Sequence, residues 1–370
     1  MYDPFHEVLS DVRGTILKQA RALDRPVIGV MPAYFPLELV YASGGFPVQL
    51  WGNRLAPSRA DAYLQSYCCS VARSAMELEL AGGADMVRGY AFTSLCDTLV
   101  NLREVYRRVV DKPTVELSIP VTQTAEARRN YLSSGLDKVN RGLQEMAGGR
   151  MTPESLAEAS ELYGRVRALQ RRLYALRLER AGLVSNLDFY AVLKAGSFLG
   201  PEYYAKLLSD LLEKLDSMDP PEDSGPRLLL SGLVYDPLEL HRILDRLGVR
   251  VVQDDFANGW RTVSKETLAV ENLVEGVARY LFGPAPCCCL YNPENDRHDY
   301  LVDHARKAGA DGVLFWYLKF CEPDAFDRPQ LMKRLTDEGI PSSVVELELS
   351  MQNFDAIGTR LSAFCEMLEG

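Results

Sequence analysis

The chain has 370 residues, 47% of them apolar, so it can bury more than one hydrophobic core. Its 41 basic and 51 acidic residues give a net charge of −10, which argues against nucleic acid or an anionic membrane as its main partner. Residues 1–20 lack the layout of a signal peptide and no apolar run could span a bilayer, so we expect a cytoplasmic protein. Eight cysteines in a reducing compartment indicate metal ligation or plain burial rather than disulfides.

The first third of the chain alternates predicted strands with predicted helices. Strands are expected over 26–34, 46–52, 86–94 and 112–120, with helices over 35–45, from about Asp61 to Leu80, and from near Cys96. This alternation is typical of a parallel α/β layer. Residues 1–123 are therefore predicted to form a first α/β domain.

The rest of the chain divides at a Pro-rich acidic stretch, MDPPEDSGP, which predicts a linker over 218–226. Before it, charged amphipathic stretches over 124–217 predict a helical segment packed on the first domain. After it, residues 227–370 are predicted to form a second α/β domain. Its expected strands are 227–234, 250–255, 312–318 and 342–348, and its expected helices are 237–248, 266–282, 300–309, 327–339 and the C-terminal segment. The predicted fold is α/β, with two Rossmann-like parallel-sheet domains and a helical segment between them.

Two cysteines lie at positions that suit a metal site. Cys96 and Cys321 each follow a predicted strand and precede a helix, at the edge where open α/β sheets place their ligands. A thiolate there is stabilised by the helix dipole and by backbone N–H groups. The alternative is that these cysteines, and Cys69 in DAYLQSYCCSVARS, are small buried hydrophobes, since the sequence has no compact C-x-x-C signature.

The other cysteines are closer to ordinary buried residues. They are Cys68, Cys287, Cys288, Cys289 and Cys365. If the run from Cys287 to Cys289 is extended, neighbouring side chains point to opposite faces, so it cannot direct all three thiols into one site. The alternative for this run is that one or two of its cysteines line a metal pocket.

Four longer motifs carry a resemblance to a known family: MPAYFPLELVYASGGFPV, DAYLQSYCCSVARSAMELEL, SLCDTLVNLREVY and FCEPDAFDRPQLMKRLTDEGIP. The chain resembles the 2-hydroxyacyl-CoA dehydratases and ATP-dependent benzoyl-CoA reductases, and DAY-x-QSY-x-C and FC-[DE]-P…DRP look most similar to the smaller cluster-bearing subunit of benzoyl-CoA reductase. The resemblance implies a 4Fe-4S cluster on Cys69, Cys96 and Cys321, with Cys68 as the alternative to Cys69. It further implies that the fourth iron is not held by cysteine and that the cluster lies in the cleft between domains.

The same resemblance implies the chemistry and the partners. The expected function is that of an iron–sulfur subunit in an oxygen-sensitive hetero-oligomer that dearomatises an aromatic acyl-CoA by low-potential one-electron steps. The expected partners are a homologous second cluster-bearing subunit and an ATP-dependent activator with its own 4Fe-4S cluster. One alternative is an (R)-2-hydroxyacyl-CoA dehydratase that eliminates water through a ketyl radical. A double-cubane cluster reductase of small molecules and a non-enzymatic electron-transfer subunit also stay open.

Tyr34 and Glu38 are candidate catalytic residues, because they lie where the first strand ends and where this family keeps substrate-facing residues. Glu38 is also explained as an acid at a helix N-terminus. A polar run after the strand at 250–255 is a further candidate for the cleft, namely Asp254, Asp255, Asn258 and Arg261. Four arginines are unranked candidates for binding the anionic CoA tail, namely Arg73, Arg88, Arg103 and Arg297.

Overall fold

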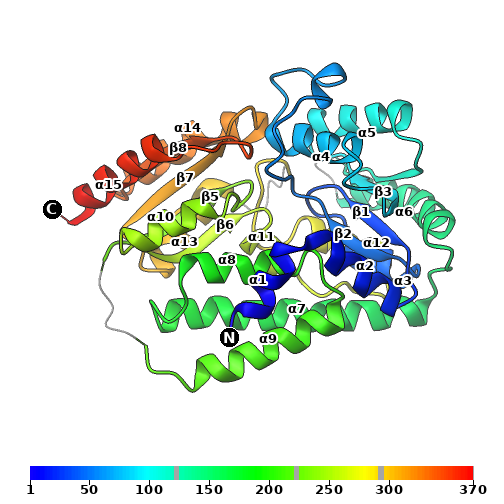
Figure 1. Cartoon of the computed structure of the whole chain (residues 1–370), viewed down its shortest axis with the longest axis horizontal. Helices are drawn as coiled ribbons and strands as arrows, with labels where there is room; N and C mark the ends of the chain where they lie inside the picture. Colours follow the sequence, from blue (N-terminus) through cyan, green and yellow to red (C-terminus); the bar gives the residue numbers. More distant parts are fainter. Residues whose placement is uncertain (121–124, 221–224, 291–295, 370) are drawn as a thin grey trace.

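The computed structural model describes residues 1–120, 125–220, 225–290 and 296–369. Two separate four-stranded sheets, both parallel throughout, form its framework (Figure 1). In the first sheet the strand order is β2-β1-β3-β4, with β1 Val27–Val30, β2 Phe46–Gln49, β3 Val87–Thr93 and β4 Thr114–Leu117. In the second it is β6-β5-β7-β8, with β5 Arg227–Gly232, β6 Arg250–Phe256, β7 Gly312–Leu318 and β8 Ser342–Leu347. The predicted α/β fold with two parallel sheets is confirmed.

The central strands are apolar because both of their faces are covered. Strand β1 is buried at all four positions, and β5 is buried at every position after Arg227. Parallel strands covered by helices on both faces read as continuous apolar runs instead of alternating patterns. This explains why both strands were recognisable from sequence.

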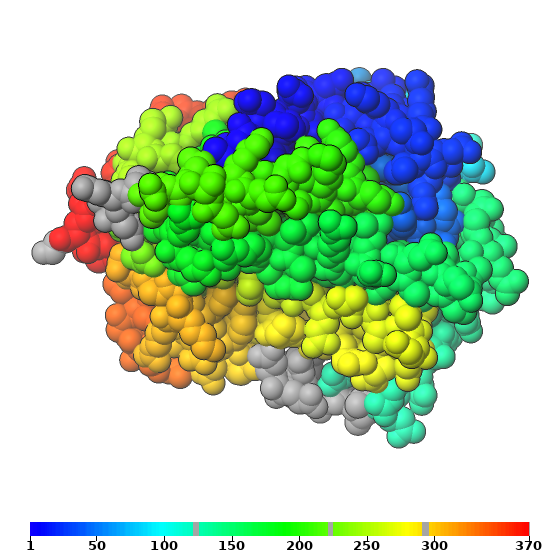
Figure 2. Space-filling view, turned by 90° about the horizontal axis from the view of Figure 1, so that it is seen from below, coloured from blue at the N-terminus to red at the C-terminus, as the bar shows by residue number. Residues whose placement is uncertain are grey.

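Four helices link the two sheets: α6 Ala125–Ala147, α7 Pro153–Glu179, α8 Asn186–Ala195 and α9 Pro201–Asp216. Helix α7 packs against α9 and also contacts α3 (Leu37–Ala42) of the first half and β6 of the second. Seen from below, this helical segment (green) lies between the N-terminal residues (blue) and residues beyond about 260 (yellow and orange), as Figure 2 shows. The helical segment between the sheets is thus as expected. The predicted domain boundary between residues 123 and 124 lies outside the described residues, as do residues 221–224 of the linker predicted over 218–226.

The remaining helices surround the sheets. The first half contains α1 Asp3–Ser10, α2 Val12–Ala22, the 3-10 turn Ala60–Ala62, α4 Ser70–Leu80 and α5 Asp97–Val109. The second half contains α10 Glu239–Arg246, α11 Trp260–Val263, α12 Leu273–Leu281, α13 Arg297–Lys307, α14 Glu322–Asp337 and α15 Asp355–Glu369. Within the described parts of the chain, no helix has both the length and the apolar character needed to cross a membrane.

Two helices are shorter than the sequence predicts. The helix expected from about Asp61 begins only at Ser70; the 3-10 turn Ala60–Ala62 and a loop precede it, and the buried carboxylate of Glu77 accepts hydrogen bonds from the backbone N–H groups of Ser58 and Ala60. The helix expected over 266–282 begins at Leu273, where the side chain of Asn272 caps it by accepting from Glu275 N–H. In this second case the side-chain cap marks the boundary.

Candidate functional site

The three cysteines singled out from the sequence share one structural position. Cys69, Cys96 and Cys321 are the N-cap residues of α4, α5 and α14, and each has an extended backbone. The late start of α4 therefore gives Cys69 the same N-cap position as the other two, although Cys69 follows a loop instead of a strand. An N-cap side chain lies beside unpaired backbone N–H groups at the positive end of the helix dipole.

One cavity brings the three thiols together. Its lining includes Cys69, Cys96 and Cys321, with Cys287 and Cys289 from the loop before α13. Cys68 is half-buried and is not among the described residues that line this cavity. Residues of both sheets contribute, because the carboxyl ends of β1, β3 and β7 all lead into this cavity, as open α/β sheets favour.

Burial disfavours the charged form of each of these thiols. It raises the pKa of Cys69 to about 11, although the N–H groups of Ala72 and Val71 act in the opposite direction. Burial likewise raises the pKa of Cys96, opposed by the N–H groups of α5, and raises that of Cys321 well above its ordinary value. Without a cation these thiols stay protonated at neutral pH. A bound metal centre would reverse this preference, since coordination deprotonates a thiol.

The run from Cys287 to Cys289 is a turn and not an extended segment. Leu290 N–H donates to the carbonyl of Cys287 at 2.9 Å, and the two residues form an isolated antiparallel bridge. The three sulfurs consequently lie within 4.8 Å of one another, close enough to bind one metal ion together. Because the run is not extended, its three thiols are not directed to opposite faces of the chain.

Tyr34 lies at the edge of the thiol cavity in an unusual backbone conformation. Its φ is +64° and that of Ala33 is +68°, and Thr93 Oγ1 donates to the Ala33 carbonyl at 2.8 Å. Positive φ is costly for residues other than glycine and persists only where the surroundings hold it. Burial raises the pKa of Tyr34 well above its ordinary value, with nearby Cys287 adding to the rise. Tyr34 thus faces the cysteine cavity as a neutral phenol.

Glu38 lies elsewhere. Its carboxylate is fully buried and pairs with Arg167 of α7 at 2.7 Å. Burial alone would lower the pKa of Arg167, but the charge of Glu38 and its contact with the guanidinium, together with Tyr280 and Tyr163, raise that pKa above its ordinary value. This ion pair joins α3 to the inter-sheet helices, and Glu38 does not appear in the described lining of the thiol cavity.

A network of buried charges stands behind the cysteine turn. Asp255 accepts from Arg261 Nε and Nη2, both at 2.9 Å, from Arg297 Nη1 at 2.7 Å and from Ser231 Oγ at 3.0 Å. Burial alone would raise the pKa of Asp255, but the two guanidinium groups lower it to about 2. Arg261 Nη1 then donates to Cys287 Sγ at 3.4 Å. Arg297 is committed to this network, so it is a poor candidate for binding CoA.

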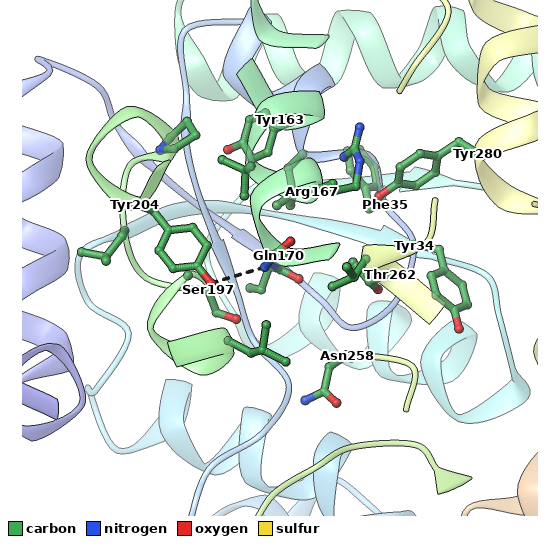
Figure 3. A pocket seen from close by; sticks show the side chains of 18 residues that line it. Tyr34, Phe35, Tyr163, Arg167, Gln170, Ser197, Tyr204, Asn258, Thr262 and Tyr280 are labelled. Carbon is green, nitrogen blue, oxygen red and sulfur yellow. Dashed lines mark hydrogen bonds between the residues drawn. The ribbon is translucent and has the colours of Figure 1, made fainter. Parts of the chain in front are cut away.

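A second, more polar cavity adjoins Tyr34 (Figure 3). Arg167 and Tyr280 lie side by side at one end, with the guanidinium 5.6 Å from the ring centre, and the Tyr34 hydroxyl points away from them. Asn258, a sequence candidate, lines this cavity and not the thiol cavity, and Gln170 Nε2 donates to Tyr204 Oη at 3.3 Å.

Two buried cations next to these cavities were not recognised from sequence. One is Arg167. The other is Lys265, whose ammonium lies 4.1 Å from the ring centre of Tyr34 and donates to the Tyr280 carbonyl at 2.6 Å. Both lie on stretches rich in charged residues, which usually form solvated faces, so no sequence signal separated them from exposed neighbours.

Comparison with known proteins agrees with the motifs. Residues 32–368 match the family described as 2-hydroxyglutaryl-CoA dehydratase, D-component. The chain is 28% identical to the (R)-phenyllactyl-CoA dehydratase beta subunit of Clostridium sporogenes, with 99% of this chain and 98% of the relative covered. It is 25% identical to the beta subunit of lactoyl-CoA dehydratase from Anaerotignum propionicum, with 98% of each chain covered.

The expected preference for the smaller benzoyl-CoA reductase subunit is not supported. A benzoyl-CoA reductase subunit from Thauera aromatica is 27% identical, over 90% of this chain and 88% of its own length; the two dehydratase subunits have similar identities and match over more of the chain. The family match covers nearly the whole chain, including every strand of the two sheets except β1, and the N-cap cysteines Cys69, Cys96 and Cys321. This chain therefore belongs to the 2-hydroxyglutaryl-CoA dehydratase D-component family, a family of 2-hydroxyacyl-CoA dehydratase and benzoyl-CoA reductase subunits.

Proposed function

We propose that this chain is the beta-type iron–sulfur subunit of an (R)-2-hydroxyacyl-CoA dehydratase. The observation that carries the proposal is the convergence of Cys69, Cys96 and Cys321, each at a helix N-terminus, on one cavity. Dehydratase beta subunits that match 96–99% of this chain support the reaction type. The reaction converts a 2-hydroxyacyl-CoA into a 2-enoyl-CoA and water, with no net gain or loss of electrons.

The donors at the cavity fit a 4Fe-4S cluster. Thiolates are the ligands that iron–sulfur clusters take, and three of them meet here from three different helices. The N–H groups at each helix start offset part of the negative charge that thiolates and cluster sulfides bring. When bound, such a cluster supplies single electrons at low potential.

The proposed assembly has three kinds of partner. A homologous cluster-bearing subunit would complete the enzyme, consistent with relatives that are named as beta subunits. An ATP-dependent activator with its own cluster would deliver the electron, and an acyl-CoA thioester would be the substrate. Placement of the cluster between the two sheet domains, and a contribution of Tyr34 to the chemistry, belong to the same proposal.

The test is reconstitution without oxygen. The chain is combined with its candidate partner subunit, the activator, ATP and a low-potential reductant, and is offered (R)-2-hydroxyacyl-CoA thioesters with aliphatic or aromatic acyl groups. We expect the matching 2-enoyl-CoA to appear by mass spectrometry, and Cys321→Ala to abolish both the iron content and the turnover. Full turnover by an iron-free Cys321→Ala complex would contradict the proposal.

Benzoyl-CoA reduction is the second candidate, supported by the match to the Thauera aromatica protein. In the same reconstituted complex, benzoyl-CoA would gain two electrons and two protons and lose its aromatic absorbance. Ring reduction without dehydration would favour this candidate over the first. A double-cubane reductase, to which the additional thiols at Cys287–Cys289 are relevant, would contain about eight irons per chain instead of about four.

A further inference from the structure

The thiol cavity contains more cysteine than a three-thiolate cluster needs. Cys287 and Cys289 line it together with the three N-cap cysteines. Among the described residues, Cys288 lines an adjoining surface groove but not the thiol cavity. Cys287 is the most buried of the three, with 5% of its surface exposed. A further thiol, that of Cys287, therefore already lines the cavity of the three N-cap cysteines.

The surroundings of Cys287 are built to hold an anionic sulfur. Arg261 is only 1% exposed, and Asp255 fixes its Nε and Nη2, which leaves Nη1 directed at Cys287 Sγ. Asp255 is itself held by Arg297. A buried guanidinium fixed in this way supplies a charge-assisted hydrogen bond to a thiolate without reorganisation.

The spacing within the turn argues against a second cubane held by these cysteines. Sulfurs that share one metal at the usual bond length of about 2.3 Å stand about 3.8 Å apart in a tetrahedral site. Cys288 Sγ and Cys289 Sγ are 4.0 Å apart, and all three sulfurs lie within 4.8 Å. Thiolates bound to different irons of one cubane must stand farther apart than this. The turn is therefore better suited to supplying a single thiolate ligand to a cubane than to holding one with several of its cysteines.

We propose that Cys287 supplies the fourth thiolate of the cluster held by Cys69, Cys96 and Cys321. This inference rests on the proposed function, and it departs from the family resemblance, which implies a fourth iron without cysteine. A cluster with four protein thiolates has no iron left for an exchangeable ligand. In this chain the cluster would then transfer electrons, and the thioester would meet iron only in the partner subunit.

The test uses cyanide as an external ligand and the electron paramagnetic resonance (EPR) spectrum as the readout. The full chain, produced without partner subunits and kept free of oxygen, is reduced and titrated with cyanide. We expect about four irons per chain and a spectrum that cyanide does not change. Cys287→Ala should keep its iron but show a new cyanide-dependent spectrum, whereas Cys288→Ala and Cys289→Ala, the matched controls from the same turn, should behave like the wild type.

Each other outcome has a defined meaning. If cyanide changes the wild-type spectrum, the inference is overturned but the proposed cluster is not. If the cyanide-dependent spectrum appears in Cys289→Ala and not in Cys287→Ala, the assignment to Cys287 is overturned. Wild-type chain that binds no iron overturns both the inference and the proposed function. If Cys287→Ala loses all its iron, two results together support the inference. Cyanide leaves the wild-type spectrum unchanged, and Cys289→Ala keeps its iron and also shows no spectral change with cyanide.

Discussion

Asp255 is the residue whose replacement tests the buried charge network most directly. Its carboxylate, fully buried at the end of β6, is the counter-charge for both Arg261 and Arg297. Asp255→Asn keeps the size and shape of the side chain but removes the negative charge. Arg261 would then be buried without its counter-charge, and Arg297 would keep only its pairing with Asp327 at 2.7 Å.

The size of the expected stability loss follows from the lowered pKa of Asp255 and from the burial of Arg261 and Arg297. Lowering the carboxyl pKa from 3.8 to about 2 corresponds to roughly 2 kcal/mol of preferential interaction with the ionised form. Because the folded-state pKa is lowered, this contribution is present above pH 3.8 and is lost as the pH falls through about 2. Leaving the partners charged and buried costs more, so we expect a loss of about 3–5 kcal/mol in the free energy of unfolding at pH 7.

Urea unfolding at pH 7, followed by far-ultraviolet circular dichroism without oxygen, measures this loss. The matched control is Asp254→Asn on the same strand, because Asp254 is equally buried but accepts hydrogen bonds from the hydroxyls of Tyr174 and Tyr190 and from backbone N–H groups. In Asp254→Asn the amide oxygen can keep the bonds from the backbone N–H groups, and the two tyrosine hydroxyls can rotate to accept from the new NH2 group, so the control should lose less. Equal losses for the two variants, or less than about 1 kcal/mol for Asp255→Asn, would refute the reasoning.

Three further outcomes are expected. Glu38→Gln should lower the free energy of unfolding by about 3 kcal/mol, because it leaves Arg167 buried without a counter-charge. The double replacement of Glu38 by Leu and Arg167 by Met should recover most of that loss, and a double variant no more stable than Glu38→Gln would contradict this. Burial lowers the pKa of Lys265 from 10.5 to about 7, so between these pH values the unfolded chain holds a proton that the folded chain lacks. In urea titrations, the free energy of unfolding of the wild type relative to that of Lys265→Met should therefore rise as the pH increases from about 7 to 10.5. A difference between the two proteins that does not change with pH would contradict this prediction. Cys69→Ala should lose the iron measured per chain while Cys68→Ala keeps it, and the reverse pattern would assign the ligand to Cys68.

The sequence by itself determined the fold class and singled out Cys69, Cys96 and Cys321 as candidate ligands. The strands could be recognised because a parallel strand covered on both faces is an uninterrupted apolar run, as in Val27–Val30 and Gly312–Leu318. Cys96 and Cys321 stood out because strand-to-helix junctions are local features of the chain. Cys69 depended on its flanking motif, because it follows a loop instead of a strand and begins a helix that the sequence pattern started near Asp61.

Only the tertiary structure decided which of the other polar residues meet. The turn at Cys287–Leu290 depends on a backbone hydrogen bond, and it brings together sulfurs that an extended chain would separate. Glu38 looked like an acid at a helix start, and its pairing with Arg167 joins residues 129 positions apart. Such pairs are chosen by packing between distant segments, so no local pattern in the sequence records them.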